Sequence, residues 1–101
     1  MTPPLALQDF VAEVVHAHPS AKFEFSPLPS GVCFFWVTIH DRNFVLEYSP
    51  QEGVGVSENL ADTPPFVGHD HFFPRLEDGI ERMRAFLREA AKAVPSDFRA
   101  A

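Results

Sequence analysis

The residues best suited to metal chemistry form the triplet His69-Asp70-His71. Two histidines separated by one residue can ligate a single ion from an extended segment, with the aspartate as a further ligand or an orienting group. A polar loop before a helix, in which Asp70 caps backbone N–H groups, explains the same residues. The sequence favours the loop interpretation, so His69, Asp70 and His71 are only weak metal candidates and no cofactor is expected.

Three more histidines could complete such a site only if the fold brings them close to the triplet. His16 and His18 have the same spacing, but in a helix their side chains point about 200° apart and cannot share one ion. His18 continues an apolar stripe, which predicts a residue at the end of a helix and at the margin of the core. His40 lies in a different segment.

The one thiol and the glycines do not form a catalytic pattern. Cys33 lies in an apolar strand, where alternation groups it with Phe35 and Val37, so we expect a packed small residue and not a nucleophile. The glutamates have no spacing that singles out an acid and a base. Gly53-Val54-Gly55 lacks the third glycine and the following helix of a phosphate loop. The sequence therefore predicts a protein without catalytic residues.

Charge and composition restrict the partners. The chain has 8 basic and 14 acidic residues, a net charge of −6, which argues against nucleic acid because phosphate binding needs a basic surface. Residues 1–74 carry a charge of −7 and residues 75–101 carry +1. The apolar runs are too short for a membrane span, and no signal peptide is expected. A single cysteine, which has no internal disulfide partner, suits a reducing cytoplasm.

Two amphipathic helices are predicted at the ends of one domain, which we expect to cover residues 1–95 with a mobile tail at 96–101. The first runs from Pro3 to Ala17, with Thr2 as its N-cap. The second runs from Leu76 to Val94 and ends at Pro95. Apolar residues recur every three or four positions in both helices: Leu7, Phe10, Val11, Val14 and His18 in the first, and Leu76, Ile80, Met83, Leu87, Ala90 and Val94 in the second.

The middle of the chain alternates with the period of β-strands. Its connections are too short for parallel crossovers, so an antiparallel meander of three to four strands is expected, in an α+β domain of order α-β-β-β-β-α. Asp41-Arg42-Asn43 is the predicted hairpin connection, and residues 59–75 form a long loop without a clear period. The strands are expected at Lys22–Leu28, Val32–His40, Asn43–Ser49 and Val54–Ser57.

The strand over 32–40 is apolar on both faces, whereas a sheet with solvent on one side normally alternates apolar and polar residues. One explanation is that a helix lies on each face, or that the long loop covers the second face. The other is that both helices cover one face and the second face meets a partner. Aromatic residues are enriched in interface cores. The interface candidates are therefore Phe34, Trp36, Phe66 and Phe72.

The function expected from these features is that of a non-catalytic, small acidic protein-interaction domain, bacterial and cytoplasmic. Toxin-neutralising immunity proteins and secretion chaperones are analogous in architecture only. The partner is a protein or a second copy of the chain, with no nucleic acid and no membrane, and the acidic charge favours a basic partner. The alternative is a small-ligand or metal-binding domain that uses the 59–75 loop.

Overall fold

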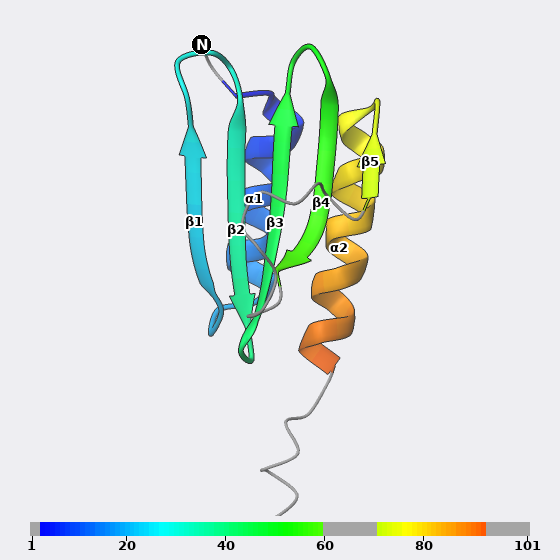
Figure 1. Cartoon of the computed structure of the whole chain (residues 1–101). Coiled ribbons are helices and arrows are strands. Elements are labelled where there is room, and N and C mark those ends of the chain that lie inside the picture. The colour runs from blue at the N-terminus through cyan, green and yellow to red at the C-terminus, as the bar shows by residue number, and fades with distance from the viewer. Residues whose placement is uncertain (1–2, 60–70, 93–101) are drawn as a thin grey trace, which may run out of the picture.

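The computed structural model describes residues 3–59 and 71–92, which form two layers: an antiparallel sheet and a pair of helices (Figure 1). The predicted α+β class and antiparallel meander are confirmed, with five strands in the order β1-β2-β3-β4-β5. Both helices lie on one face of the sheet, which excludes the explanation that a helix covers each face. The other form of that explanation, a long loop over the second face, involves residues 60–70, which lie outside the described residues. The elements are α1 (Leu5–Ala17), β1 (Lys22–Pro27), β2 (Cys33–Ile39), β3 (Arg42–Ser49), β4 (Gly53–Asn59), β5 (His71–Phe73) and α2 (Leu76–Lys92).

Helix α1 begins at Leu5, two residues later than predicted. The carbonyl of Pro4 accepts the first hydrogen bonds, from the N–H groups of Leu7 at 3.1 Å and Gln8 at 3.0 Å. Pro4 therefore occupies the position before the helix, and the predicted cap, Thr2, lies outside the described residues. Neither described helix has the length and apolarity needed to cross a lipid bilayer.

The turn between β2 and β3 is shorter than the predicted connection. His40 and Asp41 form it, with φ values of 50° and 72°, and Arg42 is already the first residue of β3. Positive φ at both central residues is the backbone of the type I′ turn, whose twist matches the twist of the flanking strands. The turn thereby sets the register in which Ile39 faces Arg42.

Strand β5 corrects the prediction of an irregular segment over residues 59–75. His71–Phe73 pairs antiparallel with β4, so that Phe72 faces Gly55 and Phe73 faces Val54. Three residues are too few to show the alternation on which strand prediction depends. Hydrogen bonding to the free edge of β4 defines this strand, and the sequence does not show which segment will pair there.

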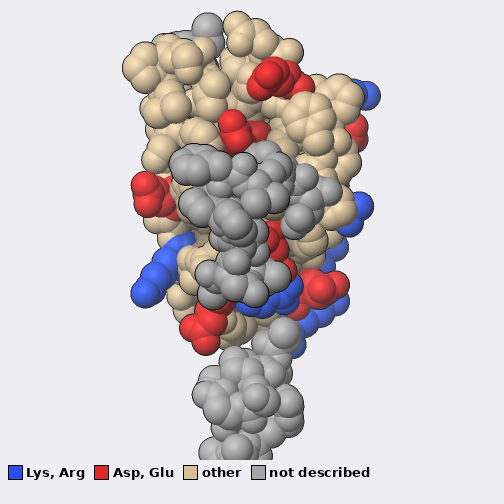
Figure 2. Space-filling view, in the orientation of Figure 1, with Lys and Arg blue, Asp and Glu red and all other residues tan. Residues whose placement is uncertain are grey.

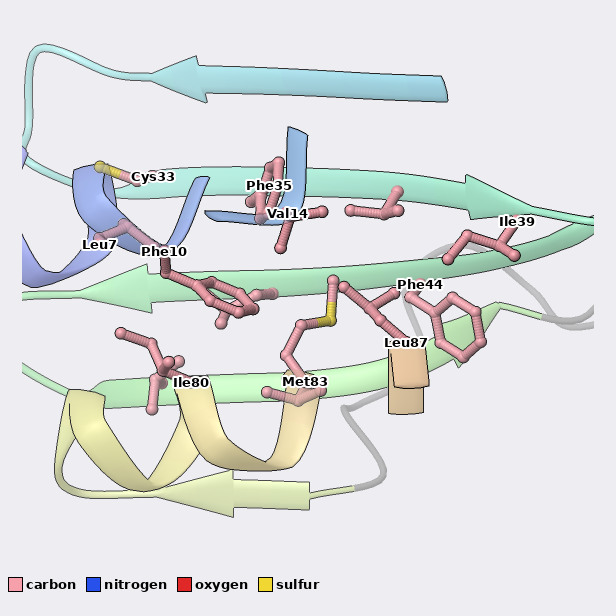
Figure 3. Close-up of a cluster of buried hydrophobic side chains, with 14 of the residues drawn as sticks. Leu7, Phe10, Val14, Cys33, Phe35, Ile39, Phe44, Ile80, Met83 and Leu87 are labelled. Carbon is pink, nitrogen blue, oxygen red and sulfur yellow. The ribbon is translucent and has the colours of Figure 1, made fainter. Parts of the chain in front are cut away.

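The core lies between the sheet and the two helices (Figure 3). The alternation predicted for β2 is confirmed, because Cys33, Phe35, Val37 and Ile39 are all buried. The rings of Phe10 in α1 and Phe35 in β2 meet edge to face, with centroids 5.9 Å apart. The two helical stripes contribute the other side of this core: Leu7, Phe10 and Val14 from α1, and Ile80, Met83, Leu87 and Ala90 from α2.

Helix α2 lies very close to β4 where it contains Gly79. A Cβ atom at this position would lie 2.7 Å from Cγ2 and 3.1 Å from Cβ of Val54, and closer still to Cγ1. Real Cβ atoms essentially never come within 3.0 Å of another heavy atom outside their own backbone. The missing side chain of Gly79 therefore determines how deeply α2 packs onto the sheet.

Among the described residues, two doubly hydrogen-bonded ion pairs join different elements of the fold. The Arg84 guanidinium of α2 donates two hydrogen bonds, of 2.7 and 2.9 Å, to the Glu13 carboxylate of α1. Arg42 in β3 donates two bonds of 2.8 Å to Glu58 in β4. These bonds hold the pKa of both carboxyl groups below the usual value, against an opposing effect of burial. The first pair joins the two helices and lines a cavity of about 330 Å³ between them, and the second joins two neighbouring strands.

Candidate functional site

Of the triplet His69-Asp70-His71, only His71 lies in the described part of the chain. Its half-buried imidazole lies on the helix side of β5, 5.5 Å from the ring of Phe86 and 6.4 Å from the ring of Phe73. Within residues 3–59 and 71–92, no group of three or more histidine, cysteine or acidic side chains is placed to hold a metal ion. The ring contacts place His71 in the packing between β5 and α2, and His69 and Asp70 lie outside the described residues.

His18 and His40, which two strands and their connections separate in the sequence, line one cavity of about 430 Å³. The cavity lies between the end of α1, the β2–β3 turn and Ala91 near the end of α2. His18 is half-buried, as expected for a residue at the end of a helix and the margin of the core, and its backbone N–H donates to Val14 at 2.9 Å. His16 does not line this cavity.

The structure places Cys33 in the core, with 1% of its surface exposed. Its S–H group donates to the carbonyl oxygen of Gly31, with the two atoms 3.6 Å apart. Burial raises the pKa of the Cys33 thiol, because a thiolate would lose its hydration there. The reactive form of cysteine is the thiolate, so this group is a poor nucleophile in the folded protein.

We expect Cys33 to react with a thiol reagent only when the chain unfolds. Under native conditions the rate of modification with a disulfide reagent should be at least about 100-fold below that of the chain in urea, because access needs global opening with a free energy of several kcal/mol. Spectrophotometric release of the reporter thiol gives both rates. Rapid modification at neutral pH without denaturant would show that Cys33 is accessible and that the core position is incorrect.

Three of the four interface candidates share the face of the sheet that the helices leave uncovered, which we call the outer face. Phe34 and Trp36 stack on each other at 6.3 Å with an interplanar angle of 14°. Trp36 is 37% exposed and Phe72 is 59% exposed, although both are large apolar side chains. The fourth candidate, Phe66, lies outside the described residues.

The strand register places acidic and small residues between these aromatic groups. Phe34 in β2 faces Glu47 in β3, Glu47 faces Gly55 in β4, and Gly55 faces Phe72 in β5. Phe34 and Phe72 are therefore separated by three strand spacings, about 14 Å. The outer face thus has aromatic side chains on β2 and on β5. Glu47 and Gly55, which has no side chain, lie between them.

Acidic groups predominate on the outer face. Glu24, Glu47 and Glu52 belong to it or to its margin, against one basic residue, Lys22, on the same face of β1. Figure 2 looks onto this face and shows red acidic groups on its upper part and around its margins, with blue basic groups at the lower left and along the lower and right-hand margins. The outer face therefore complements a surface that is basic as well as partly apolar.

A cavity of about 100 Å³ opens beside Phe72, at the end of the β3–β4 hairpin. The hydroxyl oxygen of Ser49 accepts a hydrogen bond of 3.3 Å from the backbone N–H of Glu52, which orders the turn at this point. Gly53 has a φ of +113°, which L-residues rarely adopt. The cavity is lined by Glu47, Ser49, Glu52, Gly53, Gly55 and Phe72.

Sequence reasoning did not identify this cavity. It found that Gly53 and Gly55 do not form a phosphate loop, and it found no spacing that singled out any glutamate. The signal is Gly55, because a glycine within a strand often marks the close approach of a ligand or another chain. Its two neighbours, Glu47 and Phe72, become visible only through the register of three strands.

The described residues define a class of architecture: a two-layer α+β domain with both helices on one face and an aromatic, acidic opposite face. No family model, curated protein or solved structure matches the chain. The function is therefore argued from the outer face itself.

Proposed function

We propose that the chain is a non-catalytic interaction domain whose outer face binds a partner protein with a basic, partly apolar surface. The observation that carries the proposal is the stacked pair of Phe34 and Trp36, with Phe72, on a sheet face that neither helix covers. Tryptophan and other aromatic side chains contribute a large share of the free energy in protein interfaces. Exposing them to water in a small domain is unfavourable unless a partner buries them.

The charge of the outer face favours a basic partner over a second copy of the chain. A symmetric dimer would place the outer face of one copy, with Glu24, Glu47 and Glu52, against the equally acidic outer face of the other. Like charges that meet in an interface are unfavourable, whereas a basic partner also gains in association rate. The net charge of −6 likewise favours a basic partner over a second copy of the chain.

Immunity proteins and secretion chaperones are small acidic proteins that act by such contacts, and this chain is comparable to them in architecture and charge alone. We propose a bacterial, cytoplasmic setting for it, as expected from the sequence, because a single cysteine needs no disulfide partner there. The alternative is a ligand or metal site in the 59–75 loop. Residues 60–70 of this loop lie outside the described part of the chain.

We expect Trp36→Ala to weaken partner binding by about 2 kcal/mol or more, roughly 30-fold, because the partner would bury the exposed part of the indole in the proposed interface. The same change should lower the free energy of unfolding by only about 1 kcal/mol, since Trp36 is partly exposed and loses mainly its stacking on Phe34. Cross-linking in cells of the source organism identifies the partner. Calorimetric titration of that partner with each variant then gives the affinity, and thermal melting gives the stability.

Leu5→Ala is the matched control, because Leu5 is 70% exposed but lies on α1, on the other side of the molecule. It should leave binding unchanged, whereas Phe72→Ala should weaken it.

Binding should also weaken as salt is added, since opposite charges attract less when they are screened. A partner that binds Trp36→Ala and Phe72→Ala as tightly as the natural chain would exclude the outer face. A dimer in sedimentation that Trp36→Ala dissociates would assign the face to a second copy instead.

A further inference from the structure

The cavity beside Phe72 combines negative charge, an aromatic ring and a side-chain-free floor. We infer that it receives one cationic side chain of the partner, an arginine in preference to a lysine. This inference rests on the proposed function, because it names the chemical group of the partner that the outer face binds.

The shape depends on two glycines. Gly55 lies between Glu47 and Phe72 in the strand register and has no side chain to fill the space between them. Gly53 closes the end of the cavity, where a Cβ atom would collide with the backbone carbonyl oxygen of Phe73. The volume of about 100 Å³ holds roughly three water-sized groups, the size of the planar end of an arginine side chain.

The charges favour a cation. Two acidic residues, Glu47 in β3 and Glu52 in the following turn, line the cavity. A cation there can donate charge-assisted hydrogen bonds, which are about twice as strong as neutral ones. The Phe72 ring, 59% exposed, adds the attraction between a cation and the face of an aromatic ring.

Arginine fits this combination better than lysine. Its planar guanidinium stacks on an aromatic ring while its N–H groups donate to carboxylates in the same plane, whereas the lysine ammonium is a compact point charge. A calcium ion is a poorer occupant, because it takes six to eight oxygen ligands. The described residues contain no group of three or more side chains that could hold a metal ion.

Nuclear magnetic resonance of the ¹⁵N-labelled full chain tests the cavity with defined probes. Nα-acetyl-arginine amide should shift the backbone amides of Gly53, Gly55 and Phe72 in a saturable manner, more strongly than Nα-acetyl-lysine amide. Nα-acetyl-citrulline amide, which has a similar shape but no charge, should cause no saturable shift. Glu52→Gln should raise the dissociation constant for the arginine probe about threefold to fivefold, the effect of one exposed ion pair.

Glu24→Gln is the matched control, since it removes the same charge from the outer face but Glu24 lies on β1, outside the cavity. It should leave the dissociation constant unchanged. Equal shifts with the citrulline probe, a stronger response to lysine, or equal losses in the two glutamine variants would each overturn the inference. If the probe fails while Trp36→Ala still weakens the partner complex, only the cation pocket is wrong. If the probe binds while the complex tolerates Trp36→Ala, the aromatic interface is wrong.

Discussion

Leu87→Ala should lower the free energy of unfolding by about 2–5 kcal/mol, a large part of the stability of a domain of this size. Leu87 is 1% exposed and belongs to the core that α2 forms against the sheet (Figure 3). The change removes buried methyl groups and leaves a cavity, because the rigid strands on the other side of the core cannot close over it. Urea unfolding followed by circular dichroism measures the loss.

Arg88→Ala is the control for this prediction. Arg88 follows Leu87 in α2 but is exposed, so its replacement should change the stability by no more than about 0.5 kcal/mol. The midpoint of the urea transition should shift strongly for Leu87→Ala, with little change in slope. A loss below about 1 kcal/mol would mean that α2 does not pack on the sheet through this residue.

Gly79→Ala should destabilise the protein by about 2 kcal/mol, although helix propensity alone predicts a gain of about 1 kcal/mol for this change. The new methyl group would overlap the side chain of Val54, lying 2.7 Å from Cγ2 and 3.1 Å from Cβ. Val54 is fully buried, and its branched side chain has little freedom to move aside. Overpacking of a core costs about 1–3 kcal/mol, and contact with three atoms of one rigid side chain places this site at the upper end. Subtracting the gain of about 1 kcal/mol in helix propensity leaves the net loss of about 2 kcal/mol.

A double-mutant cycle with Val54→Ala identifies the cause. Val54→Ala removes both Cγ atoms, so the methyl group that Gly79→Ala introduces can occupy the space that they leave. The double variant should therefore be more stable than the sum of the two single losses predicts, by at least about 1 kcal/mol. Additive losses, or a Gly79→Ala protein that is more stable than the natural chain, would show that α2 does not approach β4 so closely.

The two kinds of variant separate stability from binding. Leu87 and Gly79 act between the helices and the sheet, so their replacement should change unfolding. Trp36 and Phe72 are on the opposite face, so their replacement should change mainly the affinity for the partner. If the core variants changed mainly the affinity, or the outer-face variants mainly the stability, the division of the molecule into a packed face and a binding face would be contradicted.

The sequence determined the two helices, the strands β1 to β4 and the faces of those strands. Leu7, Phe10 and Val14 recur with the helical period, and Cys33, Phe35 and Val37 recur with the strand period, and both sets are buried as predicted. Periodicity is a local property, because the backbone geometry of a helix or strand directs side chains at fixed intervals to one side. The aromatic character of the second face of β2 was visible for the same reason.

Only the tertiary structure decided which groups meet across the chain. The position of both helices on one face, the pairing of β5, and the contact of Gly79 with Val54 depend on long-range packing. The same is true of the cavity, where Glu47 and Phe72 come together across Gly55. Register and layer arrangement follow from free energies summed over many distant contacts, and no short window of sequence contains them.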